Sequence, residues 1–366
     1  MVSRATSGTD LIRLAWPDVG PAEIAAVTDV LESGRLTMGP KVGEFEAALA
    51  AACEVEHAVA VSSGTAALHV ALLALRIGPG DEVLVPDYTF PATANVVALV
   101  GARPVLVDVD PTTMNVNVER AAAAVTPLTR AILAVHLFGR PLEWDALERA
   151  LPDRVALLED AAGALGARRH GRPCGSLGRL GCLSFHPRKV VTTGEGGAVV
   201  TQDDGLAQAA RQLRHHGWRP PDNADMPVAG LNYRLSDVQC ALGLTQLERL
   251  DALLDRRRGL AAGYEERLRG VVATPSASPG DEHGWQAYVV QLDRRDEALA
   301  ALREAGIEAQ IGTYAVHRLA AYREQGAFPG ADACFERALA LPFHSRLTES
   351  DLDRVAEALR PFAAPA

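Results

Sequence analysis

The sequence predicts an α/β fold: a mostly parallel central sheet with flanking helices, followed by a smaller α+β C-terminal domain. Two observations predict it. Upstream of residue 219, short apolar runs alternate with helical patterns, which is typical of a parallel sheet covered by helices. Downstream of a long helical pattern, one strand pattern and two helical patterns remain. We therefore expect a large domain at residues 1–250 and a small domain at residues 251–366, each long enough to bury a core.

The strands expected in the central sheet are short, rich in β-branched residues and apolar on both faces. Strands buried in a parallel sheet have this composition because helices cover both of their faces. The expected strands are residues 58–62, 82–86, 104–109, 131–136, 155–160 and 182–185.

The expected helices follow the spacing of apolar residues. Residues 64–75 are apolar nearly all round, which suits a helix packed inside an α/β layer. A long pattern begins at Ser236, a favourable N-cap, and links the two domains. In the small domain we expect a strand at 288–292 and helices near 297–304 and 349–359, and we interpret the Pro/Gly-rich residues 219–230 as a loop.

Charge and cysteine content exclude several classes of protein. The formal net charge of −10 is spread over interleaved acids and bases, which argues against a nucleic-acid surface or a polybasic membrane contact. The N-terminus has no apolar signal region and no apolar run is long enough to span a membrane, so we expect a cytoplasmic protein. Five cysteines without a C-x-x-C pair indicate neither a disulfide framework nor a metal site. We expect the cysteines to be buried and to pack as small hydrophobic residues.

The segment SSGTAA (62–67) is the first candidate for ligand binding. It joins an expected strand to an expected helix, where free backbone N–H groups and the positive helix end can hold a phosphate. Taken alone, the segment could equally be a plain N-cap.

Two further strand ends carry charged residues. The strand at 155–160 ends on Glu159 and Asp160, and either a helix cap or a partner for a ligand cation would explain a carboxylate there. After the next strand, which ends near Ser184, Lys189 lies in a sparsely charged segment between two apolar strands. Ligands of open α/β sheets gather at the carboxyl ends of the strands, so these residues are expected to share one site.

A phosphate cradle, a strand-end aspartate and a lysine meet the needs of pyridoxal phosphate. Lys189 would hold the aldehyde, and Asp160 would keep the pyridine nitrogen protonated so that the ring can accept electrons. An ion pair about 4 Å apart at an effective dielectric near 20 is worth roughly 4 kcal/mol. That could raise the pKa of the ring nitrogen by as much as roughly three units.

With these motifs in place, the chain resembles the DegT family of pyridoxal-phosphate sugar aminotransferases. The similar segments run in order along most of the chain and include LTMGPKVGEFE, SSGTAALHVAL, GDEVLVPDYTFPATANVV, LEDAA, SFHPRK, TTGEGG and GLNYRLSDVQ. The resemblance implies fold type I of the pyridoxal-phosphate-dependent transferases, which is the aspartate aminotransferase fold.

The resemblance also implies roles for single residues. Lys189 would be the Schiff-base lysine and Asp160 the partner of the pyridine nitrogen. Gly64, Thr65 and Ser184 would hold the cofactor phosphate.

Two more residues receive roles from the same resemblance. Phe90 would stack on one face of the cofactor ring, with simple core packing as the alternative. Asn232 would reach the phosphate of the other subunit, which implies a homodimer with shared active sites; from the sequence alone, Asn232 is a turn residue.

The implied reaction is transamination from glutamate or glutamine to a keto-sugar that is nucleotide-linked. The GEGG sequence (194–197) favours amination at C4 over C3. The alternatives are a keto-cyclitol or aromatic-precursor aminotransferase and, in another class, a non-catalytic regulatory protein that binds the cofactor. A sugar dehydratase of the same fold is disfavoured because such enzymes carry histidine where this chain has Lys189.

The chain departs from the family pattern at two places. Gly163 stands where the family usually has glutamine or histidine, so one contact to the cofactor is absent. Residues 308–324, which border the substrate entrance in the family, lack its usual Tyr-Pro and Pro-Leu-His pattern.

Overall fold

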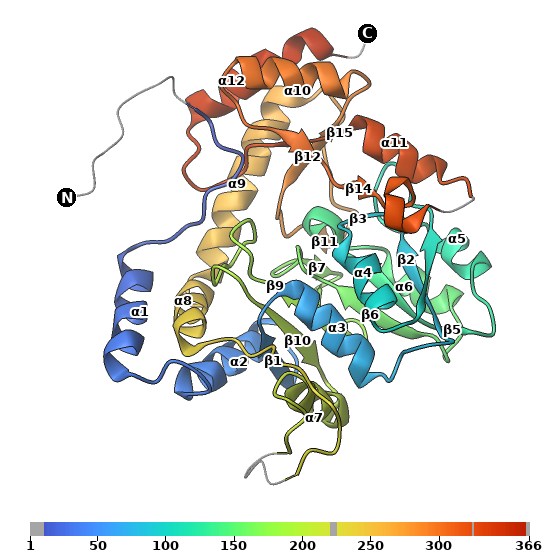
Figure 1. Cartoon of the computed structure of the whole chain (residues 1–366). Helices are drawn as coiled ribbons and strands as arrows, with labels where there is room; N and C mark the ends of the chain where they lie inside the picture. The colour runs from blue at the N-terminus through green and yellow to red at the C-terminus, as the bar shows by residue number, and fades with distance from the viewer. Residues whose placement is uncertain (1–10, 220–224, 324–325, 364–366) are drawn as a thin grey trace.

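A seven-stranded sheet forms the centre of the molecule (Figure 1). The computed structural model describes residues 11–219, 225–323 and 326–363. Strand β10 pairs antiparallel with both of its neighbours, and the remaining pairs are parallel. In spatial order the strands are β1 (His57–Val61), β10 (Gly197–Thr201), β9 (Leu180–Ser184), β6 (Ala156–Asp160), β5 (Thr129–Val135), β2 (Glu82–Pro86) and β4 (Arg103–Val107).

The expected strands are present, with their ends displaced by at most a few residues. Alternate residues of each strand face opposite layers, as the pleat requires. On β1, for example, Val59 and Val61 belong to one hydrophobic cluster, and Ala58 and Ala60 belong to the other. Both faces of the sheet are therefore buried.

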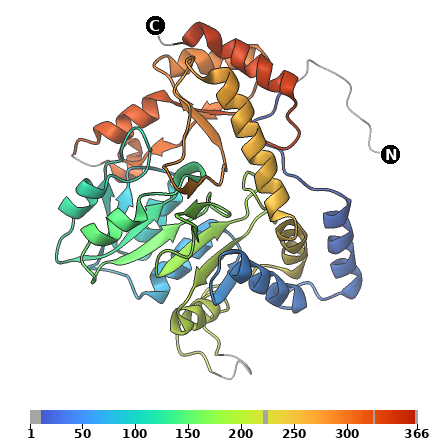
Figure 2. The same ribbon diagram turned by 180° about the vertical axis from the view of Figure 1, so that it is seen from behind.

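Helices cover the two faces of the sheet (Figures 1 and 2). Helices α3 (Gly64–Ala74), α4 (Ala92–Leu99) and α7 (Asp204–Leu213) contribute to the cluster on one face. The other face is covered by α2 (Pro40–Ala52), α5 (Val118–Ala123), α6 (Trp144–Ala150) and α8 (Asp237–Leu247), while α1 (Pro21–Ser33) packs against α8.

The long pattern that begins at Ser236 forms two helices rather than one. Ser236 caps α8 as expected, with a capping box that includes Gln239. The break falls between α8 and α9 (Leu250–Leu268), where Arg249 lies outside both helices. Its guanidinium forms ion pairs with Asp18 and Glu23, which ties the break to the N-terminal segment.

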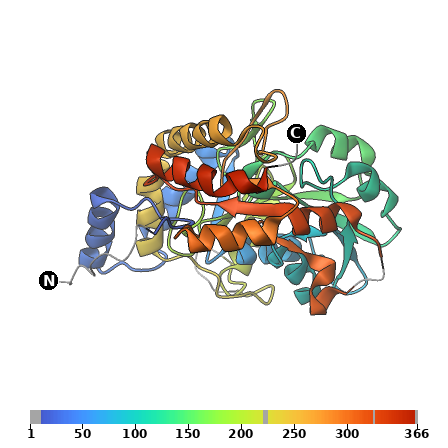
Figure 3. The same cartoon turned by 90° about the horizontal axis from the view of Figure 1, so that it is seen from above.

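The C-terminal part contains a small antiparallel sheet (Figure 3). Its strands are β12 (Tyr288–Gln291), β15 (Ala338–Leu341) and β13 (Gln310–Ile311). A separate hydrophobic cluster packs this sheet against α9, α10 (Arg295–Glu304) and α12 (Glu349–Leu359), and Ile12 from the N-terminal segment joins it. Helix α11 (Pro329–Arg337) and the short pair β3 (Tyr88–Thr89) and β14 (Tyr314–Ala315) connect this part to the central sheet.

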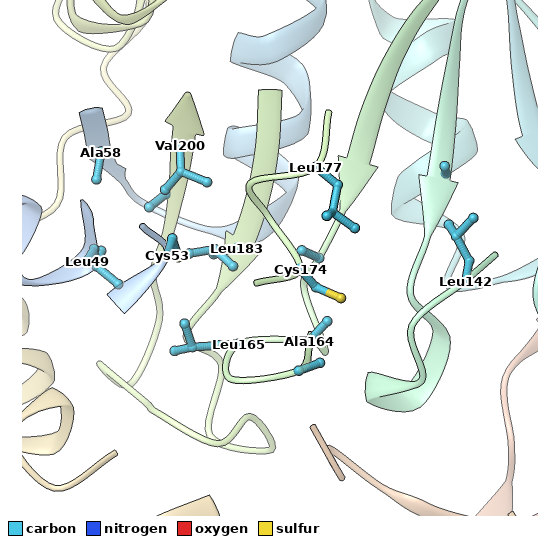
Figure 4. Close-up of a cluster of buried hydrophobic side chains, with 14 of the residues drawn as sticks. Leu49, Cys53, Ala58, Leu142, Ala164, Leu165, Cys174, Leu177, Leu183 and Val200 are labelled. Atoms are coloured by element: carbon cyan, nitrogen blue, oxygen red, sulfur yellow. The ribbon is translucent and has the colours of Figure 1, made fainter. Parts of the chain in front are cut away.

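The five cysteines are free and buried, as the sequence predicted. Figure 4 shows Cys53 and Cys174 in an apolar cluster with Leu49, Leu177 and Leu183. Of the loop expected at 219–230, residues 220–224 lie outside the described part of the chain. Among the helices that are described, none combines the length and apolarity needed to cross a bilayer.

Candidate active site

Strands β6 and β9 lie next to each other and bring the expected site residues to one edge of the sheet. Asp160, the last residue of β6, pairs in register with Cys182 of β9. Strand β9 ends two residues later at Ser184 and continues into the hairpin loop 185–196, which carries Lys189 and returns as β10. The structure thus brings Asp160, Ser184 and Lys189 together, as the sequence predicted.

The carboxyl group of Asp160 is buried and only partly satisfied. The residue is 6% exposed. Its Oδ2 accepts a hydrogen bond from Thr93 Oγ1 at 2.8 Å, and its Oδ1 accepts one from the Ala162 N–H at 3.2 Å. Burial raises the pKa of Asp160, although these two hydrogen bonds and the nearby Lys189 charge oppose the shift. A cation placed at this carboxylate would stabilise its charged form.

Lys189 carries an amine with no hydrogen bond or ion pair to any described residue. Desolvation lowers the pKa of its ammonium group, and the attraction of Asp160 only partly offsets this effect. A desolvated lysine without a partner is costly for folding. It is also the form of lysine that is most available as a nucleophile or a base, because a larger fraction of it is neutral.

The first turn of α3 abuts the end of β9 and forms a cradle. Ser63 is the N-cap of α3, and its Oγ accepts from the Ala66 N–H at 3.0 Å. The plain capping role considered for this segment is therefore present. The N–H groups of Gly64 and Thr65 lie ahead of the intrahelical ladder and remain available to an anion.

Gly64 is required by the close approach of these two elements. A Cβ atom added at Gly64 would lie 2.8 Å from the Cβ and 3.1 Å from the Oγ of Ser184. Glycine thus lets the helix terminus and the Ser184 hydroxyl face the same space. The three residues expected to hold a phosphate are together.

Phe90 and Asn232 are both on the surface of the single chain. Phe90 is 64% exposed, so the core-packing alternative is wrong. It lies three residues before Thr93, the partner of Asp160, and its carbonyl accepts the Thr93 N–H. Asn232 is exposed, and its Oδ1 accepts from Arg234 Nε at 2.9 Å. The neighbouring Tyr233 carbonyl accepts the Ser62 N–H, which places this segment beside the phosphate cradle.

Glu159, the other carboxylate expected at this strand end, points away from the site. It is fully buried and accepts hydrogen bonds from His136 Nε2 and from the N–H groups of Gly175, Leu177 and Gly178, at 2.6–2.9 Å. The Leu142 N–H donates to Nδ1 of His136, so Nε2 is the nitrogen that directs its proton toward Glu159. Glu159 therefore anchors the loop 173–178 and contacts no part of the site.

Sequence reasoning did not identify Thr93. Nothing in the helical pattern of residues 92–99 distinguishes this threonine from one that merely packs. Its role becomes visible only because β2 and β6 are both parallel strands of one sheet, so that α4, which follows β2 and β3, reaches the end of β6.

The assembled residues fit pyridoxal phosphate. The partly satisfied, buried Asp160 can face a pyridinium nitrogen, the unpaired amine of Lys189 can reach an aldehyde, and the cradle of Gly64, Thr65 and Ser184 can hold a phosphate. The cradle leaves room that a Cβ at Gly64 would remove.

A family comparison gives an independent account of the chain. The model of the DegT/DnrJ/EryC1/StrS aminotransferase family matches residues 17–360. Among curated proteins, GDP-perosamine synthase from Caulobacter vibrioides is 41% identical over 334 residues, which cover 88% of this chain and 90% of the relative.

Solved structures of similar sequence share the fold. DesV from S. venezuelae, solved in complex with a ketimine intermediate, is 38% identical with a TM-score of 0.89, and the match covers 94% of this chain and 95% of that chain. The PLP form of Spr1654 from Streptococcus pneumoniae, a putative sugar aminotransferase by its description, is 29% identical with a TM-score of 0.92, covering 96% and 98%.

Proposed function

We propose, from the premise that this chain belongs to the DegT/DnrJ/EryC1/StrS aminotransferase family, that it moves an amino group from glutamate or glutamine to a nucleotide-linked keto-sugar. The family prediction is confirmed, and with it the fold type I architecture, the aminotransferase class and the pyridoxal phosphate cofactor. The alternative of a non-catalytic binder and the dehydratase alternative are set aside on the same ground. The observation that carries the site is the convergence of Lys189 and Asp160 at one sheet edge.

Pyridoxal phosphate, when bound, supplies an aldehyde that reacts with amines and a ring that accepts electrons. In our proposal the amine of Lys189 would hold that aldehyde and, when free, would hold or move a proton. The freed amine is a suitable general base because desolvation lowers its pKa toward neutrality. Asp160 supplies the negative charge that keeps the ring nitrogen protonated, and Thr93 orients its carboxylate.

The substrate proposal draws on two kinds of support. Several relatives and structural neighbours are described as sugar aminotransferases, and one is a synthase of a GDP-linked sugar. The sequence GEGG at 194–197 favours C4 as the position of amination. A keto-cyclitol is the alternative acceptor. Residues 308–324, which depart from the family pattern, would determine which of the two acceptors is bound.

We further propose a homodimer with shared active sites. Phe90 would stack on the cofactor ring, and Asn232 would reach the phosphate held by the partner subunit. Such an interface would give the strongly exposed apolar residues of the described surface a partner to pack against. Several lie on or just after α1: Ile24, Leu31, Leu36 and Met38.

The division into domains at residue 250 also stays a proposal. The separate hydrophobic cluster of the C-terminal part supports this division. Ile12 belongs to the same cluster, so the small domain would also include part of the N-terminal segment.

The decisive test uses the scarcity of lysine in this chain. The 366 residues contain only two lysines, Lys41 and Lys189. After borohydride reduction of the enzyme with bound cofactor, peptide mapping should find the pyridoxyl group on Lys189. Label confined to any other amine would refute the proposed site.

Lys41 provides a matched control. It lies on α2 and forms a surface ion pair with Glu44 at 2.6 Å. Lys189→Ala should abolish both the covalent label and turnover, whereas Lys41→Ala should retain both. Turnover of candidate keto-sugars and keto-cyclitols with glutamate or glutamine then tests the substrate proposal separately.

A further inference from the structure

Gly163 and Gln286 face each other at the edge of the proposed site. Gly163 lies in the turn after β6, three residues beyond Asp160. A Cβ atom added there would lie 3.4 Å from Gln286 Oε1 and 3.5 Å from Gln286 Cβ. The space into which a side chain at 163 would grow is therefore occupied by a glutamine that lies between α9 and β12, two residues before the strand begins.

The Gln286 side chain also reaches the segment that carries Lys189. Its Nε2 donates to the Arg188 carbonyl, one residue before Lys189, at 3.3 Å. Its Oε1 has no hydrogen-bond donor among the described residues. The carboxamide thus spans the Asp160 turn and the Lys189 loop and retains an unused acceptor.

Several contacts fix the backbone of Gln286. Its N–H donates to the Phe138 carbonyl at 3.1 Å, and its carbonyl accepts from Arg257 Nη1 at 3.2 Å. The same guanidinium is 3.4 Å from the Lys189 carbonyl through its Nη2. Arg257 is partly buried, and desolvation lowers its pKa to about 10. A partly buried cation that donates to backbone carbonyls therefore ties Gln286 to Lys189.

Gly139 permits this close approach. It has φ +92°, and a Cβ there would lie 2.9 Å from the Gly163 carbonyl and from the Trp285 nitrogen, and 3.0 Å from the Gln286 nitrogen. The position of Gln286 is thus built by several elements and does not depend on one exposed side-chain contact.

We infer that Gln286 is a positioning residue for the cofactor, and that its carboxamide supplies the polar contact which Gly163 cannot make. This inference rests on the proposed Lys189–Asp160 site. A hydrogen-bonding group that is carried by the chain between α9 and the small sheet would make cofactor binding sensitive to the placement of that segment. Gln286 would act by orienting the cofactor and by holding the Lys189 loop.

The test compares cofactor affinity in Gln286→Ala with that in Gln291→Ala. Gln291 lies on the adjoining strand β12, and its Nε2 likewise donates to a backbone carbonyl, that of Pro111 at 2.9 Å, so it is a matched control. Loss of one hydrogen bond should weaken cofactor binding about three- to tenfold in Gln286→Ala and leave Gln291→Ala unchanged. Dissociation constants from tryptophan quenching and thermal unfolding of the cofactor-free proteins are the two readouts.

A more specific test adds a side chain at position 163 to the Gln286→Ala variant. Gly163 does not have a positive φ, so its backbone accepts a side chain. Gly163→Gln in the Gln286→Ala background should restore most of the affinity, because the new carboxamide enters the vacated space. The double variant should also return the visible absorbance band of the bound cofactor to its wild-type position.

Three outcomes would overturn the inference. One is an unchanged affinity in Gln286→Ala, and another is an equal loss in Gln291→Ala. The third is destabilisation of cofactor-free Gln286→Ala with no recovery in the double variant, which would mark a purely structural role. If wild-type protein bound the cofactor but carried no label on Lys189, the proposed function would fail first.

Discussion

Glu159 and Asp160 are neighbours at the end of β6, yet the pleat of the strand points them to opposite faces of the sheet. Glu159 receives four hydrogen bonds from His136 and the loop 173–178. Asp160 receives two, from Thr93 and from the Ala162 N–H. A buried carboxylate whose acceptor sites are filled by the protein serves the fold, whereas one with unused capacity is available to a ligand. Replacing the carboxylate by an amide should therefore affect activity at Asp160 and stability at Glu159.

The largest effect is expected from Asp160→Asn. The amide keeps the size of the side chain but removes the charge that would hold the ring nitrogen protonated. An ion pair worth up to roughly 4 kcal/mol corresponds to a loss of about two to three orders of magnitude in kcat. Steady-state kinetics with saturating cofactor check this expectation. A kcat within threefold of wild type would contradict the role of Asp160.

The next largest effect is expected from Glu159→Gln, and it should be on stability. The new amide group would point donors at N–H groups that now donate to the carboxylate, leaving buried donors unsatisfied. We expect the free energy of unfolding to fall by about 3 kcal/mol. Urea unfolding of the cofactor-free protein measures this change. If the variant instead kept its stability and lost cofactor binding, the contrast with Asp160 would be refuted.

A smaller effect is expected from Thr93→Val. Valine matches the shape of threonine but removes the hydroxyl that donates to Asp160 Oδ2. Loss of this hydrogen bond should destabilise the charged form of Asp160 by about 1 kcal/mol and lower kcat several-fold. Thr245→Val, which removes a bond to the Ala241 carbonyl within α8, is the control and should leave kcat unchanged.

The smallest effect concerns pH and the cofactor-free protein. Burial raises the pKa of Asp160 above its ordinary value near 3.8, so the folded protein holds this proton more tightly than the unfolded chain does. The stability associated with Asp160 is therefore complete below that ordinary value and is lost as pH rises through the raised pKa. Unfolding free energies from pH 4 upward should fall in wild type relative to Asp160→Asn, and a constant difference between the two would contradict the raised pKa.

Much of the sheet could be predicted because local chemistry marks its strands. The runs at 82–86 and 155–160 are apolar, β-rich and bounded by polar residues, so their limits follow from composition. The break at Arg249 could not be predicted in the same way. The apolar spacing continues across it, and the ion pairs with Asp18 and Glu23 that accompany it come from a distant segment.

In the candidate site too, some residues could be predicted from local sequence and others could not. Lys189, Asp160 and Gly64 could be proposed because a charge or a glycine at a strand end has a local meaning. The structural role of Glu159 could not be predicted, since it depends on three-dimensional contacts with the loop 173–178. The sequence did not indicate a role for Gln286, because its partners Gly163 and Arg188 are about a hundred residues away in the chain.

The loop that carries Lys189 is closed at its base by backbone bonds. The Phe185 N–H donates to the Gly196 carbonyl, and the Thr193 N–H donates to the Phe185 carbonyl. Both ends of this loop are thus fixed to adjacent strands, so its backbone has little freedom to travel. If Lys189 performs both of the tasks proposed for it, rotation about its four-carbon stem can carry the nitrogen from one to the other, and the reach of that stem sets the distance over which one amine can serve both.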